Sequence, residues 1–132
     1  MVRVLICEDD PLQAIDLADA VAASGGEVCA CVRSSAEALD AASQMAPDVS
    51  LIDLTLADGE TGIDLAIALA KTGCRVVVLT GSPHSPAKLG SIRHSFVSKP
   101  VSTEIVAELL RLSSVDGKPV QLAPARPQTP AR

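Results

Sequence analysis

Short apolar segments alternate with segments of helical periodicity along this chain, and this alternation restricts the fold more than any other feature. The predicted strands are Val2–Cys7, Glu27–Val32, the run that ends at Asp53, Arg75–Thr80 and Phe96–Ser98. Strands separated by helices are typical of a parallel sheet whose connections cross over in the right-handed sense. The sequence therefore predicts a doubly wound α/β domain, with helices on both faces of a five-stranded parallel sheet.

Turn and capping residues divide the intervening segments into helices. Pro11 opens the first helix, in which Leu12, Ile15, Ala18 and Ala22 recur at helical spacing before Gly25–Gly26. Ser34, with Glu37 three residues later, forms a capping box for a second helix that runs to about Met45.

Two further helices are predicted in the second half of the chain. One runs from about Thr61 to Thr72 and carries a predicted inner face of Ile63, Ala66, Ile67 and Ala70. The other is capped by Ser102 and carries Ile105, Leu109 and Leu112, with Val106 and Leu110 beside them. Between Gly81 and Ser95, two prolines and a glycine leave room only for a short or frayed helix.

The composition limits the classes of partner and the compartment. The chain has 132 residues, a net charge of -5 and 48% apolar residues, with Phe96 as its single aromatic residue. An acidic chain is a poor candidate for nucleic-acid binding, which requires a basic surface. No apolar run reaches membrane-spanning length, and the first strand starts too near Met1 to leave room for a signal peptide. We therefore expect a cytoplasmic protein that binds neither nucleic acid nor membrane.

Four cysteines, Cys7, Cys29, Cys31 and Cys74, lie in or beside strand-like segments. Their spacing lacks the two-residue spacer of a zinc knuckle, so we expect reduced thiols in the core.

The composition changes near the end of the chain. Four prolines follow residue 115, and apolar periodicity stops. We predict a folded domain over residues 1–115 and a Pro-rich disordered tail over 116–132 that adds nothing to folding.

Polar side chains follow four of the five predicted strands. Glu8, Asp9 and Asp10 follow the first strand, Asp53 ends the third, Thr80 ends the fourth and Lys99 follows the fifth. Because all strands of a parallel sheet point the same way, these residues are expected to meet in one crevice. Each residue by itself has an ordinary explanation as a turn, cap or surface residue, and only the combination indicates a site.

The predicted crevice has the groups needed for phosphoryl transfer onto a carboxylate. Clustered carboxylates repel one another, and a hard divalent cation such as Mg²⁺ relieves that repulsion. Asp9 and Asp53 would bind the metal, Thr80 would donate a hydrogen bond to a phosphoryl oxygen, and Lys99 would act as a point charge. Asp53 is the predicted nucleophile. Three acids occupy the first turn, where nucleotide-binding relatives have a Gly-rich loop.

These residues give the chain a resemblance to the receiver domains of two-component response regulators. The matching pieces are Glu8-Asp9, Asp53, Thr80-Gly81 and Lys99-Pro100, with Phe96 at the family's switch-aromatic position. The resemblance spans about Val2 to Leu112 and implies a flavodoxin-like fold with strand order 2-1-3-4-5.

The resemblance also implies a role for each site residue. Asp53 would be phosphorylated by a histidine kinase or a histidine phosphotransfer protein. Asp9 and Asp53 would bind Mg²⁺ directly, Glu8 through water, and Thr55 through its backbone carbonyl. Thr80 and Phe96 would couple phosphorylation to a protein-binding surface, and Asp10 would have a supporting role. The family's cis peptide is expected at Lys99-Pro100.

The sequence departs from the common receiver pattern in two loops. Ala57 replaces the usual proline four residues after the phosphoacceptor, and the loop to Gly62 is about one residue longer. That loop resembles the one in receivers of some alphaproteobacterial stress-response regulators. The segment between Thr80 and Phe96 is shorter than usual.

Since no output domain follows Leu112, we expect a stand-alone receiver that signals by protein binding and is not itself an enzyme, apart from its phosphotransfer and autodephosphorylation chemistry. Two alternatives remain open. A dehalogenase-type phosphatase also uses a strand-end Asp, but it requires a second Asp where this chain has Thr55. The other alternative is a receiver-like interaction module that works without phosphorylation.

Overall fold

The computed structural model describes residues 1–81 and 86–113. Its strands are β1 (Arg3–Cys7), β2 (Glu27–Val32), β3 (Val49–Asp53), β4 (Arg75–Thr80) and β5 (Ser95–Ser98). Its helices are α1 (Pro11–Ala23), α2 (Ser35–Met45), α3 (Gly62–Ala70), the 3-10 helix η1 (Ala87–Ser91) and α4 (Thr103–Ser113). All paired strands are parallel, and their order is β2-β1-β3-β4-β5. The predicted flavodoxin-like topology is confirmed.

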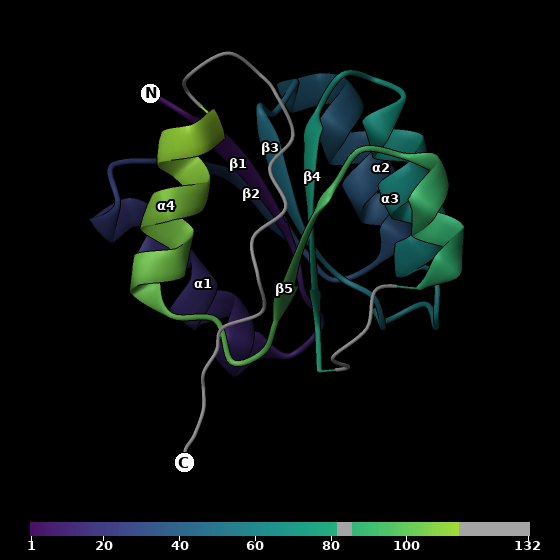
Figure 1. Cartoon of the computed structure of the whole chain (residues 1–132), viewed down its shortest axis with the longest axis horizontal. Coiled ribbons are helices and arrows are strands. Elements are labelled where there is room, and N and C mark those ends of the chain that lie inside the picture. Colours follow the sequence, from purple (N-terminus) through teal and green to yellow (C-terminus); the bar gives the residue numbers. More distant parts are fainter. Residues whose placement is uncertain (82–85, 114–132) are drawn as a thin grey trace.

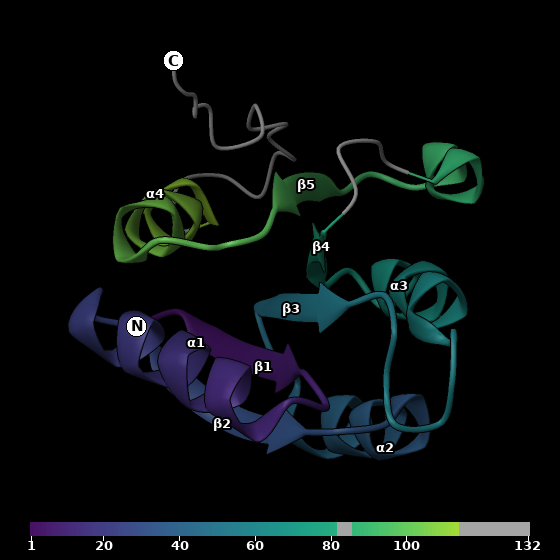
Figure 2. The same cartoon turned by 90° about the horizontal axis from the view of Figure 1, so that it is seen from below.

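Helices cover both faces of the sheet: α1 and α4 lie on one face, and α2 and α3 lie on the other (Figures 1 and 2). The side chains of the central strands alternate between two cores, as the two-residue period of a strand requires. Val4, Ile6 and Leu51 pack on the α1–α4 face, whereas Leu5 and Ile52 pack on the α2–α3 face. Each central strand is therefore buried on both sides, which explains its nearly continuous apolar sequence.

The buried face of α1 differs from the set of apolar residues that the sequence places at helical spacing. Leu12 and Ile15 are 73% and 56% exposed, while the buried residues of the helix are Leu17, Ala20 and Val21. The buried set also repeats at helical spacing, so the sequence contains two possible stripes. Packing against Val106 and Leu110 of α4 selects the second stripe.

The third helix is shorter than predicted, and its inner face is shifted. It begins at Gly62 and ends at Ala70, and its buried residues after Gly62 are Leu65, Ala66 and Leu69. Of the four predicted inner residues only Ala66 is fully buried. The helix is apolar on nearly every side, so periodicity alone could not identify the face that meets the sheet.

The predictions for the cysteines and the loops have mixed outcomes. All four cysteines are free, but only Cys7 is fully buried and Cys31 is exposed, because β2 is an edge strand. The segment before β5 contains the five-residue η1. The peptide bond between Lys99 and Pro100 is cis, as expected. Among the described residues, no helix combines the length and apolar character needed to cross a membrane. The predicted disordered tail lies outside the described residues.

Candidate functional site

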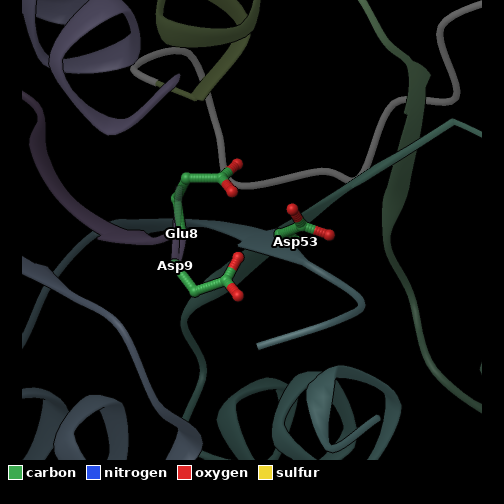
Figure 3. Close-up of side chains that lie close together, drawn as sticks. All are labelled: Glu8, Asp9 and Asp53. Atoms are coloured by element: carbon green, nitrogen blue, oxygen red, sulfur yellow. The ribbon is translucent and has the colours of Figure 1, made fainter. Parts of the chain in front are cut away.

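Three carboxylates meet where β1 and β3 end. These strands are parallel neighbours, with Cys7 beside Ile52, so the residues that follow them emerge next to each other. Single carboxylate oxygens of Glu8, Asp9 and Asp53 all lie within 4.8 Å of one another. Figure 3 shows the three side chains gathered at these strand ends. The structure thus brings together the acids that the sequence placed at this edge.

Lys99 joins this cluster from the end of β5. Its Nζ donates to Asp53 Oδ2 at 2.6 Å and to Glu8 Oε1 at 3.3 Å. The Lys99 backbone N–H donates to the carbonyl of Thr80 at 2.7 Å, which holds the ends of β4 and β5 together. One ammonium therefore contacts two of the three clustered carboxylates.

Burial and neighbouring charge change the protonation of the cluster. Glu8 is 1% exposed, and burial, followed by the hydrogen bond and charge of Asp53, raises its pKa to about 7. Burial opposes the charged form of Lys99, but its contacts with Asp53 and Glu8 outweigh that effect and raise its pKa. The site holds its ammonium firmly charged and keeps one carboxylate close to protonation at neutral pH.

Asp10 is not part of the acid cluster. Its side chain caps α1 by accepting from the backbone N–H groups of Leu12 at 2.9 Å and Gln13 at 3.4 Å. These bonds, with one from the Gln13 side chain, lower the pKa of Asp10. The supporting role predicted for Asp10 is therefore helix capping.

Gln13 is a site residue that the sequence analysis missed. Its Oε1 accepts from Lys99 Nζ at 2.7 Å, and its Nε2 donates to Asp10 Oδ2 at 3.1 Å. Gln13 thereby connects the α1 cap to the site ammonium. The available signal was its position three residues after the cap, the spacing at which a second capping side chain usually occurs.

Asp58 holds the loop between β3 and α3 against α2. It accepts from the Ser35 backbone N–H at 3.1 Å, from Ser35 Oγ at 2.7 Å and from Thr61 Oγ1 at 2.8 Å. These hydrogen bonds hold the pKa of Asp58 well below its usual range. The longer loop, which carries Thr55, is therefore held at the first turn of α2. No pattern in the sequence predicts this contact.

Gly62 lets α3 start directly against the end of β3. A Cβ atom at this position would lie 2.4 Å from Leu54 Cα and 2.6 Å from the carbonyl oxygen of Asp53. Both neighbours are backbone atoms, so they cannot move aside as a flexible side chain could. Only glycine allows this approach behind the phosphoacceptor candidate.

The two predicted switch residues lie on neighbouring strands. Thr80, which is buried, ends β4, and β4 pairs with β3 so that Leu79 lies beside Asp53. Phe96 lies beside Val78 in the β4–β5 pair and is partly buried against the α2–α3 core. Their coupling remains a prediction, as does the role of the Thr55 carbonyl. The Thr55 backbone N–H donates to Asp53 Oδ1 at 3.1 Å.

The donor set fits a magnesium ion. Glu8, Asp9 and Asp53 supply converging carboxylate oxygens, and hard oxygen donors are the ligands that Mg²⁺ prefers. No histidine or cysteine belongs to this group of described residues, so a softer metal is disfavoured.

The family model for the response regulator receiver domain matches residues 4–111. The chain belongs to this family. The matched stretch includes all the elements that supply the clustered side chains, which confirms the resemblance and the fold inferred from the strand-end residues.

Several relatives of this receiver chain are regulators named PhyR. The chain is 39% identical over 83 residues to the phyllosphere-induced regulator PhyR of Methylorubrum extorquens, a stretch covering 61% of this chain and 31% of that protein. It is 26% identical to the receiver domain of Erythrobacter litoralis PhyR, with a TM-score of 0.71 and 85% and 88% of the two chains covered. For Brucella abortus PhyR the identity is 28% and the TM-score is 0.70, and the match covers 84% of this chain and 46% of that chain. The chain thus spans about a third of its curated relative and under half of the Brucella protein.

Proposed function

We propose that this receiver accepts a phosphoryl group on Asp53 and signals by phosphorylation-dependent binding to another protein. The observation that carries the proposal is the contact of Asp53 Oδ2 with Lys99 Nζ at 2.6 Å, inside a cluster of three carboxylates. This arrangement places a half-buried carboxylate nucleophile beside a fixed positive charge. The phosphoryl donor is a histidine kinase or a histidine phosphotransfer protein, and the expected compartment is the cytoplasm.

In the proposed reaction, a carboxylate oxygen of Asp53 forms a bond to phosphorus while the bond from phosphorus to the donor imidazole breaks. The imidazole takes up a proton as it leaves. Glu8, Asp9, Asp53 and the carbonyl of Thr55 would hold Mg²⁺, which when bound neutralises charge between the carboxylates and the phosphoryl oxygens. Lys99 already lies against Asp53, so it can stay paired with the product's negative charge after a small movement.

Loss of the phosphoryl group by water attack is part of the same proposal. Hydrolysis of the aspartyl phosphate would return the Asp53 carboxylate and inorganic phosphate, so the chain would reset without a separate substrate. The dehalogenase-type alternative loses support because the matched family is that of receivers and because Thr55 occupies the position of its acid/base. The chain would therefore act as a switch and not as a phosphatase.

The surface proposed for partner binding lies around Phe96. Thr80 ends the strand beside the one that carries Asp53, and Phe96 lies on the next strand. In this proposal the Thr80 hydroxyl contacts a phosphoryl oxygen. A new phosphoryl group can shift an equilibrium only through contacts that differ between two states. One relative, PhyR of Bartonella quintana, is described as an anti-anti-sigma factor, which supports a protein, such as an anti-sigma-type factor, as the downstream partner.

An NMR comparison with beryllofluoride, a phosphoryl mimic, tests this coupling. Thr80→Val keeps the side-chain shape and removes the donor, so the variant should still bind the mimic at Asp53 while the shift changes around Phe96 disappear. Thr72→Val, on the exposed surface after α3, serves as the matched control and should respond as the wild type does. Equal changes at Phe96 in wild type and Thr80→Val would exclude Thr80 as the coupling residue.

A further inference from the structure

A cavity of about 660 Å³ opens at the N-terminal ends of the strands, at the opposite edge of the sheet from Asp53. It lies among the C-terminal ends of α2 and α3, the residues that begin β3 and β4, and the residues before β5. Its lining includes Leu39, Leu69, Asp48, Arg75, Arg93 and His94. Asp48 and Arg75 stand at the starts of the same two strands that end at Asp53 and Thr80.

Arg75 is the unusual residue of this cavity. Both terminal nitrogens of its guanidinium are inaccessible to solvent, and neither has a hydrogen-bond partner within residues 1–81 and 86–113. A guanidinium has five donors and remains charged at any physiological pH. A buried cation without a partner is strongly unfavourable, so the position is set up for an acceptor that the described residues do not supply.

Several acceptors at this edge of the sheet are engaged by other donors. Arg3 donates from Nη1 to the carbonyls of Met45 and Ala46 at the end of α2, and its backbone N–H donates to Asp48 Oδ2 at 2.8 Å. The carbonyl of Asp48 accepts from the backbone N–H of Arg75 at 3.0 Å.

Carbonyl oxygens at the end of α3 also accept hydrogen bonds from nearby donors. Thr72 donates to the carbonyl of Leu69 from both its backbone N–H, at 3.0 Å, and its hydroxyl, at 2.7 Å. Gly73 donates to the carbonyl of Ala70 at 3.2 Å. These four carbonyls, of Met45, Ala46, Leu69 and Ala70, thus have donors other than the Arg75 guanidinium.

We propose that this cavity binds a carboxylate, held by the planar fork of Arg75 beside the positive charge of Arg93. A carboxylate matches a guanidinium with two parallel hydrogen bonds, and the pair is strongest where water is excluded. Leu39, Ala42 and Leu69 form an apolar wall, which suits a carboxylate carried on a short apolar body. Arg75 lines the cavity, so the proposal requires its side chain to turn and present the fork to the ligand.

The carboxylate can come from two sources. One is a small organic acid in solution. The other is Asp116, the only acidic residue that follows Ser113 in the sequence. Ser113 lines the cavity and lies three positions before Asp116. Three residues span about 10 Å when extended.

The test follows the Nε–Hε NMR signal of Arg75 in the full-length wild-type chain while acetate or butyrate replaces chloride at constant ionic strength. Arg75→Lys, which keeps the charge but removes the fork, assigns the signal. Arg33, an exposed arginine after β2, is the control for nonspecific screening. If a free acid is the occupant, the Arg75 signal shifts and saturates, with butyrate saturating at lower concentration than acetate, while Arg33 does not change.

A parallel arm uses the full-length Asp116→Asn variant without added acid. If Asp116 is the occupant, this substitution moves the Arg75 signal and makes it respond to acetate, whereas the wild type does not respond. If a free acid is the occupant, Asp116→Asn leaves the signal unchanged and both proteins titrate alike. The proposal is overturned if neither the acids nor Asp116→Asn moves the Arg75 signal, or if Arg75 shows only the unsaturated drift seen at Arg33.

Discussion

The C-terminal ends of the strands form the carboxyl edge of this sheet, and their N-terminal ends form the opposite edge. The two edges differ in how their charged side chains are paired. At the carboxyl edge, Lys99 bonds to Asp53 and Glu8, and the remaining acid, Asp9, lies within reach of the same cluster. At the opposite edge the Arg75 guanidinium is buried with no partner among the residues described. A parallel sheet gathers strand ends at both edges, but within residues 1–81 and 86–113 the Arg75 guanidinium has no counter-charge like the one that Lys99 has. The comparison indicates that charge matching must be examined at both edges when a site is sought.

Gly62→Ala should have the largest effect on the carboxyl edge. The added Cβ would meet the backbone of Leu54 and Asp53, and overpacking against atoms that cannot move costs on the order of 3 kcal/mol. Urea unfolding of the variant measures the loss in the free energy of unfolding. Gly90→Ala is the matched control, since no atom lies within 4 Å of a Cβ there. A similar loss in the free energy of unfolding in both variants would show that the close contact of Gly62 with the β3 end does not hold α3 in place.

Exchanging the central cation of each edge for methionine should change stability in opposite directions. Lys99→Met leaves the buried Glu8 and Asp53 without their counter-charge and should lower the free energy of unfolding by about 2 kcal/mol in chelator. Arg75→Met removes an unpaired buried cation and should be neutral or stabilising by about 1 kcal/mol in chloride buffer.

Urea unfolding of both variants, with and without Mg²⁺, measures the contrast. Added Mg²⁺ should reduce the loss in Lys99→Met, because a cation can replace the ammonium. If Arg75→Met and Lys99→Met lowered the free energy of unfolding equally, the cation at each edge would have to be paired. The two edges would then not differ.

Asp58→Asn should have the smallest effect, and that effect should depend on pH. The folded-state pKa of Asp58 lies below its ordinary value of 3.8, so its stabilising contribution is complete above 3.8 and is lost as the pH falls through the lower folded value. The melting temperature of the variant should therefore lie below that of wild type at neutral pH, and the gap should close in acid. Asp40→Asn is the control, because this side chain accepts hydrogen bonds from Gln44 on the same exposed helix surface. A gap that does not change with pH would rule out the carboxylate as the cause.

Most of the fold and the central residues of the candidate site could be predicted, because strand ends in a parallel sheet are fixed by topology. Glu8, Asp9, Asp53 and Lys99 needed only the correct strands to converge. Gln13 and Asp58 were missed because their partners are set by loop conformation, which leaves no periodic signal in the sequence.

Helix faces and the opposite edge were harder for different reasons. Helical spacing does not identify the buried face of α1, because two apolar stripes compete on this helix and only tertiary packing distinguishes them. Arg75 was missed because a basic residue at the start of an apolar strand is ordinarily a solvated end residue. Its burial depends on side chains from α2, α3 and the segment before β5, which no local pattern records.

The most direct test of the central claim is the intact mass of the protein after incubation with a small phosphodonor. The account predicts one added phosphoryl group in wild type with Mg²⁺, and none in Asp53→Asn or in excess chelator. Asp58→Asn should still accept the group, because its carboxylate lies in the loop and outside the acid cluster. Unchanged phosphorylation of Asp53→Asn, or of wild type in excess chelator, would contradict the assignment of Asp53 as a magnesium-dependent phosphoacceptor.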